Sequence, residues 1–266
     1  DLGRLLGDLV YLSDRPQRKQ RTLVHLQQAF PDQSEQWCRT VLRNVYRHLS
    51  VSVVDAVQFV RQARTGHGRE MLELEGFEQL DTRNDGTGII FVTGHFGHWE
   101  VLGAAGKAIG YPVWSLARPL PNPLLDQYVQ ELRESTGLRS LDKRGSMRRT
   151  IRLLEQGHNV AFLMDQYARH NAITVPFFGK PAATVTSPAR IALYTGAPIA
   201  FVYAVRDDGR KKFRVVVDDL IEPRRDADEE EEIERITKRF TRDLERVIRR
   251  KPSRWLWLHR RWKLYR

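Results

Sequence analysis

A short apolar run that breaks at a glycine constrains the fold of this chain more than any other stretch. Residues 89–92 are isoleucine, isoleucine, phenylalanine and valine, and they follow a turn sequence that ends at Gly86. Apolar residues of this kind, bounded by turn residues, are typical of a strand buried on both faces of a parallel sheet. The small residues of 101–110 then predict a helix. We therefore expect a strand that runs through a glycine-flanked turn into a helix.

The turn carries a histidine and a glutamate five positions apart, His95 and Glu100. Five residues along one helix would place them on different faces, so the pair makes sense only with His95 in the turn and Glu100 in the first helical turn. Glu100 could then accept a hydrogen bond from one ring nitrogen of His95 and leave the other as a base for a hydroxyl. The spacing alone occurs often by chance, but the strand, glycines and helix around it favour a catalytic dyad.

Strand and helix patterns alternate after this motif, which predicts a parallel sheet. Expected strands lie at 112–117, 138–141 and 159–164, a hairpin pairs 198–205 with 213–218, and expected helices lie at 124–137, 146–156, 187–195 and from 226 onward. Ligand-binding groups gather at the carboxyl ends of parallel strands, and three such ends carry His95, Arg118 and Asp165.

The opening third of the chain predicts helices: one at the start, one over 22–30 after a basic connector at 14–21, and one from Ser34 to about Val60. We therefore predict an α/β fold in a single domain of residues 1–266, with a central mostly parallel sheet flanked by helices. Residues 1–68 would form an N-terminal helical layer, and residues 69–266 the α/β catalytic portion.

The composition is strongly basic, with a formal net charge of +11 and a pI near 10.0. Such a balance predicts an anionic partner: nucleic acid, an anionic membrane leaflet, a phosphorylated lipid or an acidic carrier protein. The basic residues are spread over every segment and no nucleic-acid module is recognisable, which argues against nucleic acid. The single cysteine, Cys38, excludes an internal disulfide and predicts a buried thiol, and the histidines lack zinc-ligand spacing, so we expect no metal.

The first helix carries an apolar stripe, at Leu2, Leu5, Leu6, Leu9 and Val10. A stripe with this spacing usually faces a protein core, and the alternative is a helix that lies on or leads to a membrane. No run reaches the 18 or so apolar residues that span a bilayer. Because the sequence begins at Asp1 and not at Met, an N-terminal anchor could precede it.

Two loops supply candidates for binding an anionic substrate. Residues 118–123 read Arg-Pro-Leu-Pro-Asn-Pro, and three prolines make this loop rigid. Arg118 could pair with a phosphate or carboxylate in a forked geometry, or be an ordinary surface arginine. The second loop is the basic turn Asp142-Lys-Arg144.

Several motifs resemble, in order, those of the lipid A biosynthesis (lauroyl/myristoyl) acyltransferases of the lysophospholipid acyltransferase-like superfamily. They are Leu23 with Ala29-Phe30-Pro31, the H-x4-D/E motif at 95–100, the 118–123 loop with Asp126 and Arg133, the turn at 142–144, Asp165-Gln166, the stretch 175–179, and Trp-x-Trp-x-His-Arg-Arg-Trp at 255–262. The resemblance runs from about Leu2 to Lys263. One departure is His98, where the family commonly has asparagine, so His98 could tune the site.

The resemblance implies a glycerolipid acyltransferase-like fold and a membrane-associated enzyme at the cytoplasmic face of the bacterial inner membrane. The co-substrate would be an acyl carrier protein or coenzyme A thioester, the acceptor an anionic lipid A precursor, and no cofactor is needed. In the terminal motif we expect Trp255 and Trp257 to be packed, and some of Arg260, Arg261 and Lys263 to face lipid. The resemblance implicates Arg133 and Asp165 near the dyad. The substrate-binding candidates are these two together with Arg118, Asn122 and Arg144 of the two loops.

In the mechanism that these features suggest, His95, oriented by Glu100, removes a proton from an acceptor hydroxyl that attacks the thioester. Backbone N–H groups of residues 94–99, or Arg133, would stabilise the oxyanion. Two rivals stay open. One is an acyltransferase for another glycolipid, of the phosphatidylinositol mannoside type with a coenzyme A donor. The other is a catalytically silent protein of the membrane surface.

Overall fold

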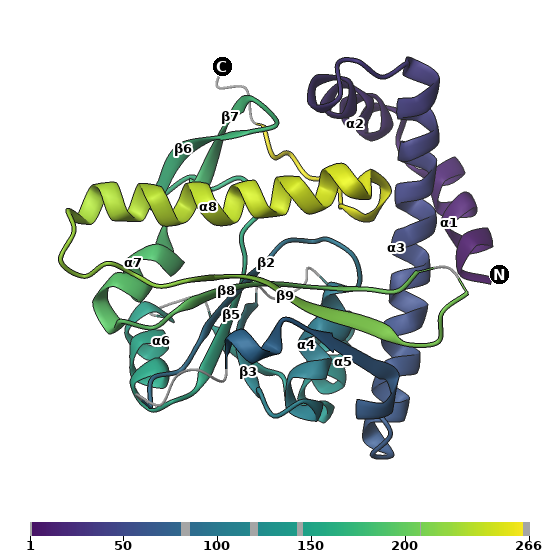
Figure 1. Ribbon diagram of the computed structural model, residues 1–266. Helices are drawn as coiled ribbons and strands as arrows, with labels where there is room; N and C mark the ends of the chain where they lie inside the picture. The colour runs from purple at the N-terminus through teal and green to yellow at the C-terminus, as the bar shows by residue number, and fades with distance from the viewer. Residues whose placement is uncertain (1, 81–85, 118–121, 143–145, 208, 263–266) are drawn as a thin grey trace.

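A seven-stranded sheet with helices on both faces forms the centre of the molecule, in a computed structural model that describes residues 2–80, 86–117, 122–142, 146–207 and 209–262 (Figure 1). The strand order is β1-β9-β8-β2-β5-β3-β4. The strands are β1 (Leu72–Glu75), β2 (Ile90–Thr93), β3 (Val113–Ala117), β4 (Arg139–Asp142), β5 (Asn159–Leu163), β8 (Ile199–Val205) and β9 (Phe213–Ile221).

The five strands from β8 to β4 run parallel, whereas β9 pairs antiparallel with β8 and has β1 parallel at its far side. A separate antiparallel hairpin consists of β6 (Ala172–Phe177) and β7 (Lys180–Val185). The predicted α/β class with a mostly parallel central sheet is confirmed, and so is the hairpin of β8 with β9. Because β2 lies between β5 and β8 and is fully buried, its apolar run faces protein on both sides.

The helices form layers on the two faces of this sheet (Figure 1). The helix α8 lies along one face, with α7 and α6 next to it in turn, and α4 packs on the other face against β8 and β3. The bounds are α1 (Leu2–Ser13), α2 (Pro16–Ala29), α3 (Glu35–Arg64), α4 (Trp99–Ala108), α5 (Pro123–Ser135), α6 (Ser146–Glu155), α7 (Ser187–Thr195) and α8 (Glu229–Arg250).

The expectation that the apolar stripe of α1 faces the core is wrong. Leu2, Leu5 and Leu9 are more than half exposed, and α1 instead turns Gly3 and Gly7 toward α3. A Cβ atom on Gly7 would lie 2.5 Å from the Cα atom of Arg47, so only glycine permits this close approach. Within the described residues no helix is both long and apolar enough to cross a bilayer.

The expected basic connector at 14–21 is largely helical, because α2 begins at Pro16. Proline suits this position, since it lacks the N–H group that has no partner in a first helical turn and its φ is preset for a helix. The helix α3 begins as predicted: the Ser34 hydroxyl accepts a hydrogen bond from the N–H of Trp37 at 3.1 Å. Cys38, on α3, is fully buried as predicted.

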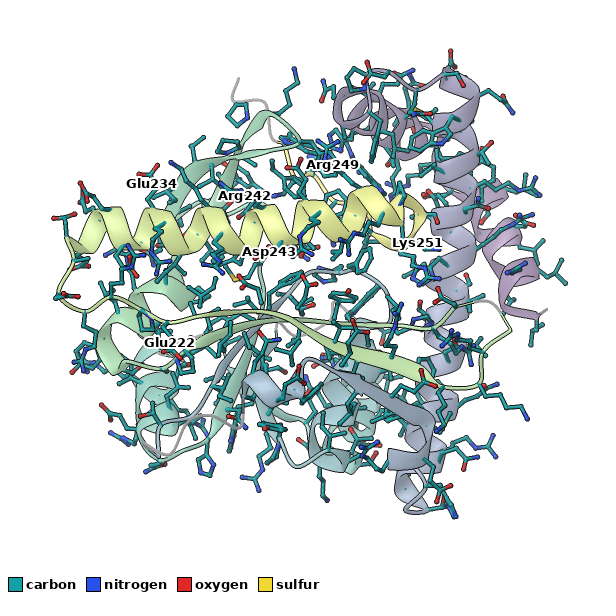
Figure 2. All side chains as sticks on the ribbon, viewed as in Figure 1. Glu222, Glu234, Arg242, Asp243, Arg249 and Lys251 are labelled. Carbon is teal, nitrogen blue, oxygen red and sulfur yellow. The ribbon has the colours of Figure 1, made fainter. Side chains whose placement is uncertain are left out.

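The helix α8 separates a charged outer face from an apolar inner one, as its sequence predicted. Ile233, Ile236, Phe240, Leu244 and Ile248 are all buried. Figure 2 labels charged residues along α8: Glu234, Arg242 and Arg249 are exposed, whereas Asp243 is buried. Arg246 offsets that burial by donating hydrogen bonds to Asp243 and to Asp218 of β9, so α8 is fixed to the sheet by charge as well as by apolar contact.

The segment after α8 folds back onto the turn that follows β2. Trp255 and Trp257 are buried, which confirms the prediction for both. Arg261 is buried too, so it is not one of the basic residues of this motif that face outward: it donates a hydrogen bond to the carbonyl oxygen of Ala183 at 2.9 Å and lies over the ring of Phe177. Arg260 is exposed, as expected of a residue toward lipid, and Lys263 lies outside the described residues.

Candidate active site

The turn between β2 and α4 is held by its backbone at the carboxyl edge of the sheet. The N–H groups of Gly97 and His98 donate hydrogen bonds to the carbonyl oxygens of Arg254 at 2.9 Å and Ala204 at 2.8 Å. Gly97 has a φ of +61°, and a Cβ atom there would lie 2.1 Å from the oxygen of Ala204. Glycine is therefore required at this position, which explains one of the two glycines that flank His95.

Asp165, and not Glu100, holds the imidazole of His95. The Nδ1 atom of His95 lies 2.8 Å from Oδ1 of Asp165, and the backbone N–H of His95 donates to Oδ2 at 2.7 Å. The indole N–H of Trp255 donates to the same Oδ2 at 2.8 Å. A carboxylate with these donors fixes the tautomer that carries its proton on Nδ1, which leaves Nε2 as the basic nitrogen.

The register of the sheet brings Asp165 to this place. Thr93, the last residue of β2, pairs with Leu163, the last residue of β5, so both chains leave the sheet at the same level. His95 and Asp165 each follow two residues later. The expectation that strand ends bring these two together is confirmed, and the role we gave to Glu100 as hydrogen-bond partner of His95 is wrong.

Burial and charge act in opposite directions on this pair. Burial alone would raise the pKa of Asp165, but the charge and hydrogen bonds of His95 outweigh it and hold that pKa well below its usual range. Burial alone would lower the pKa of His95, but Asp165 outweighs it and raises the pKa, and Glu100 adds to this. The His95 side chain keeps 16% exposure, and its Nε2 has no hydrogen-bond partner within the described part of the chain.

Glu100 sits in the first turn of α4, as predicted, but pairs with an arginine. Nη2 of Arg133, on α5, lies 2.8 Å from one Glu100 oxygen, and its Nε lies 3.3 Å from the other. The two side chains are 24% and 38% exposed, so both remain accessible beside His95. The sequence thus identified Arg133 as a residue near His95 and Glu100, but did not predict that it pairs with Glu100.

The other predicted binding residues are less informative. The Asn122 side chain accepts a hydrogen bond from the N–H of Leu124 at 3.0 Å at the start of α5, which is a helix-capping contact. Arg118 and Arg144 lie outside the described residues, so their predicted roles stay predictions.

A second histidine and carboxylate lie behind the turn. Nε2 of His98 is 3.0 Å from one oxygen of Asp55, on α3, and Arg206 donates to the other Asp55 oxygen. His48, also on α3, lies with its Nε2 3.1 Å from the carbonyl oxygen of Gly97. Burial lowers the pKa of His98 and lowers that of His48 to about 3. The sequence singled out His98 but gave no sign of Asp55 or His48, because α3 is about 40 residues upstream.

The C-terminal motif supplies a residue that we had not assigned to the site. The ring of His259 lies 4.7 Å from that of His95, edge to face at 67°, and the ring of Trp99 lies 5.4 Å from His95 on another side. The only sequence signal was the position of His259 within the Trp-x-Trp-x-His-Arg-Arg-Trp motif.

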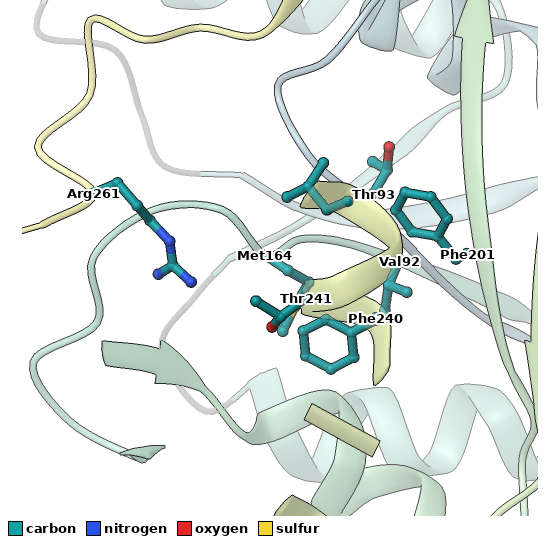
Figure 3. Close-up of a pocket in the computed structure, with 8 residues that line it drawn as sticks. Val92, Thr93, Met164, Phe201, Phe240, Thr241 and Arg261 are labelled. Carbon is teal, nitrogen blue, oxygen red and sulfur yellow. The ribbon is translucent and has the colours of Figure 1, made fainter. Parts of the chain in front are cut away.

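The expected oxyanion site can be compared with the geometry of the turn. The backbone N–H groups of residues 95–98 donate to acceptors within the protein, so these four are not available to the oxyanion site that we expected of residues 94–99. A cavity lined by Val92, Thr93, Met164, Phe201, Phe240, Thr241, Leu244 and Arg261 has a volume of about 10 Å³ (Figure 3). That is the room of about one water molecule, so the cavity as it stands does not hold an acyl chain.

Comparisons with known proteins identify the family of this chain. The sequence model of the bacterial lipid A biosynthesis acyltransferases matches residues 2–264. The lipid A biosynthesis lauroyltransferase of Escherichia coli K12 is 26% identical over 98% of this chain and 84% of its own length. The palmitoleoyltransferase of the same strain is 26% identical over 97% and 84%. A lipid A biosynthesis acyltransferase of Haemophilus influenzae is 26% identical over 90% and 75%.

Among solved structures, the 1-acyl-sn-glycerophosphate acyltransferase PlsC from Thermotoga maritima matches 91% of this chain and 98% of its own, at 17% identity and a TM-score of 0.39. The sequence matches show that the protein is an acyltransferase. It belongs to the bacterial lipid A biosynthesis acyltransferase family.

Proposed function

We propose that this protein transfers a fatty acyl chain from an acyl carrier protein thioester to a hydroxyl of a lipid A precursor, with His95 as the base. The observation that carries the proposal is the open Nε2 of an imidazole whose Nδ1 is fixed by a buried carboxylate. Membership of the family supports the acceptor, because the named relatives act in lipid A biosynthesis.

In the proposed reaction, Nε2 of His95 takes the proton of the acceptor hydroxyl as its oxygen bonds to the thioester carbon. The tetrahedral intermediate then collapses, the carbon–sulfur bond breaks, and the imidazolium returns the proton to the leaving thiolate. Base assistance of this kind contributes about 10²–10⁴-fold. Asp165 stabilises the imidazolium without taking its proton, because its own pKa is held low.

We assign Glu100 and Arg133 to the substrate side of the site. Arg133 keeps N–H donors beyond the two that Glu100 accepts, and these suit a phosphate of the lipid headgroup. Glu100 fixes that arginine and, through its charge, makes His95 more basic. The His95/Glu100 dyad of the sequence analysis thus becomes an indirect pair, linked by charge and by Arg133.

A basic groove on α6 supports a carrier protein as the donor. Arg148, Arg149 and Arg152 are exposed, form no ion pair within the described residues, and line a groove of about 370 Å³. The helix α6 begins after the carboxyl end of β4, so its first turn lies at the same edge of the sheet as His95. An acidic carrier surface is complementary to this groove in charge.

Exposed apolar residues on α1 support attachment to a membrane surface. Six large apolar side chains of one helix face outward, at Leu2, Leu5, Leu6, Leu9, Val10 and Leu12. Together with the net positive charge, they suit an anionic bilayer such as the cytoplasmic face of the bacterial inner membrane.

The test is mass spectrometry of lipid products after incubation with acyl carrier protein or coenzyme A thioesters and a tetra-acylated lipid A precursor. One added acyl mass that disappears in His95→Ala, but persists in the matched control His67→Ala, would support both the reaction and the base. His67 is an exposed histidine outside the site. Transfer only to a mannosylated lipid would replace the acceptor, and no transfer to any lipid would indicate the silent membrane-surface protein.

The donor is tested separately. Charge reversal of Arg148, Arg149 and Arg152 to glutamate should raise KM for the carrier-protein thioester by about tenfold or more and leave the coenzyme A thioester unaffected. An equal effect on both donors would contradict carrier docking at α6.

A further inference from the structure

The proposed reaction needs donors for the oxyanion, and several N–H groups of the turn around His95 are already engaged. Its N–H groups at residues 95–98 are bonded to Asp165, Gly94, Arg254 and Ala204. Arg133 binds Glu100 through two of its nitrogens, and we have assigned its remaining N–H donors to a phosphate of the lipid headgroup. A further donor beside His95 would strengthen the stabilisation of the oxyanion.

His259 is placed beside the base by main-chain contacts. The N–H of Leu256 donates to the carbonyl oxygen of His95 at 3.0 Å, and Trp255 forms a β-bridge with Phe96. These contacts and the burial of Trp255 and Trp257 fix the segment on which His259 sits. The two imidazole rings then meet edge to face, 4.7 Å apart.

The hydrogen bonding of His259 leaves one nitrogen for a ligand. Its Nε2 lies 3.4 Å from the side-chain amide nitrogen of Gln166, which as a donor makes Nε2 the acceptor. The proton of the neutral ring then resides on Nδ1, and Nδ1 has no hydrogen-bond partner within the described residues. Burial, with the charge of His95, lowers the pKa of His259 to about 4, so the ring is neutral near pH 7.

We propose that His259 is a second catalytic imidazole, which donates a hydrogen bond from Nδ1 to the thioester carbonyl oxygen as negative charge develops on it. The proposal rests on the proposed acyl transfer and deepens it. A neutral donor suits this task, since it stabilises the oxyanion and does not compete with His95 for a proton. The two histidines thereby take different roles, His95 as base and His259 as electrophile.

The experiment compares steady-state acyl transfer by the wild type, His259→Ala, His259→Asn and the control His67→Ala. The asparagine amide nitrogen can occupy the position of Nδ1 and donate, whereas alanine cannot. We expect kcat to fall about 10²-fold in His259→Ala with KM for the acceptor nearly unchanged, and His259→Asn to recover about tenfold.

Several results would overturn the proposal. A kcat for His259→Ala within about threefold of the wild type would remove the donor role. Equal losses in the alanine and asparagine variants would leave only a packing role. If His259→Ala does not fold, His259→Phe replaces it, since phenylalanine keeps a ring without the donor, and wild-type kcat in that variant would also refute the proposal. A wild type that transfers no acyl chain defeats the proposed function itself, and this inference with it.

Discussion

Two histidine–carboxylate pairs lie three residues apart in the same turn, and they behave in opposite ways. His95 meets Asp165 at 2.8 Å, His98 meets Asp55 at 3.0 Å, and both carboxylates are buried. Yet the pKa of His95 is raised and that of His98 is lowered. Distance and partner chemistry are nearly the same, so the difference comes from the surroundings.

The second partner of each carboxylate explains the difference. Asp55 is shared with the guanidinium of Arg206, and Arg254 adds further positive charge, so burial of His98 is not offset. Within the described residues, the other hydrogen bonds to Asp165 come from the neutral N–H groups of Trp255 and of the His95 backbone, and its charge raises the pKa of His95. Nδ1 of His98 is also buried and has no hydrogen-bond partner among the described residues, whereas the His95 side chain remains accessible. A histidine–carboxylate pair is therefore a base or a structural link depending on what else the carboxylate binds.

Removing the carboxylate charge from the pair of His95 and Asp165 should have the largest effect on acyl transfer. Asp165→Asn keeps the shape of the side chain but no longer fixes the tautomer or stabilises the imidazolium, so kcat should fall by about 10²–10⁴-fold. The measurement is kcat for acyl transfer, compared with that of the wild type and of His95→Ala. Activity of Asp165→Asn within a few-fold of the wild type would show that the pair of His95 and Asp165 is not the catalytic one.

The same change in the pair of His98 and Asp55 should affect the stability of the fold more than the rate of acyl transfer. Asp55→Asn leaves Arg206 and His98 without their charged partner, which should lower the free energy of unfolding by about 3 kcal/mol. Urea titration measures this, with Glu234→Gln as control, because an exposed helix pair contributes less than about 1 kcal/mol. Equal stability of Asp55→Asn and the control would contradict a structural role.

Glu100 should have an intermediate effect that reaches His95 through charge. Glu100→Gln should lower kcat/KM by about 10–10²-fold, because Arg133 loses its charged partner. It should also move the acid limb of the pH profile of kcat/KM to lower pH, since Glu100 raises the pKa of His95. An acid limb that stays in place would exclude an electrostatic contact between the two.

The smallest effect is expected at His98 itself. A lowered pKa means that the folded state binds this proton less readily than the unfolded chain. The contribution of neutral His98 to the free energy of unfolding is therefore complete above about pH 6.5 and is lost as the pH falls. His98→Asn should keep activity within about threefold and reduce the loss of stability on acidification. Thermal unfolding between pH 5 and 7.5 measures this against His67→Asn, and an unchanged slope would contradict it.

The strand, turn and helix around His95 were predictable because their signals are local: an apolar run, two glycines and small helical residues. Asp165 was predictable in part, since parallel strands end at one edge of the sheet. The partner of His95 was not, because it depends on the register between β2 and β5, which brings together residues 70 positions apart. The outward face of α1 was missed for a related reason. Gly3 and Gly7 determine which face of α1 contacts α3, and the spacing of the apolar residues does not indicate this contact.

The return of the C-terminal segment to the turn has a consequence for how the enzyme is made. Ribosomes deliver residues 255–262 after every strand of the sheet, and Trp255 is the residue that completes the donors of Asp165. A nascent chain that already holds the whole sheet would still lack this bond and the ring of His259. We expect acyl transfer to begin only after residues 255–262 have been made and have packed against this turn, so that a nascent chain without them does not act on lipid.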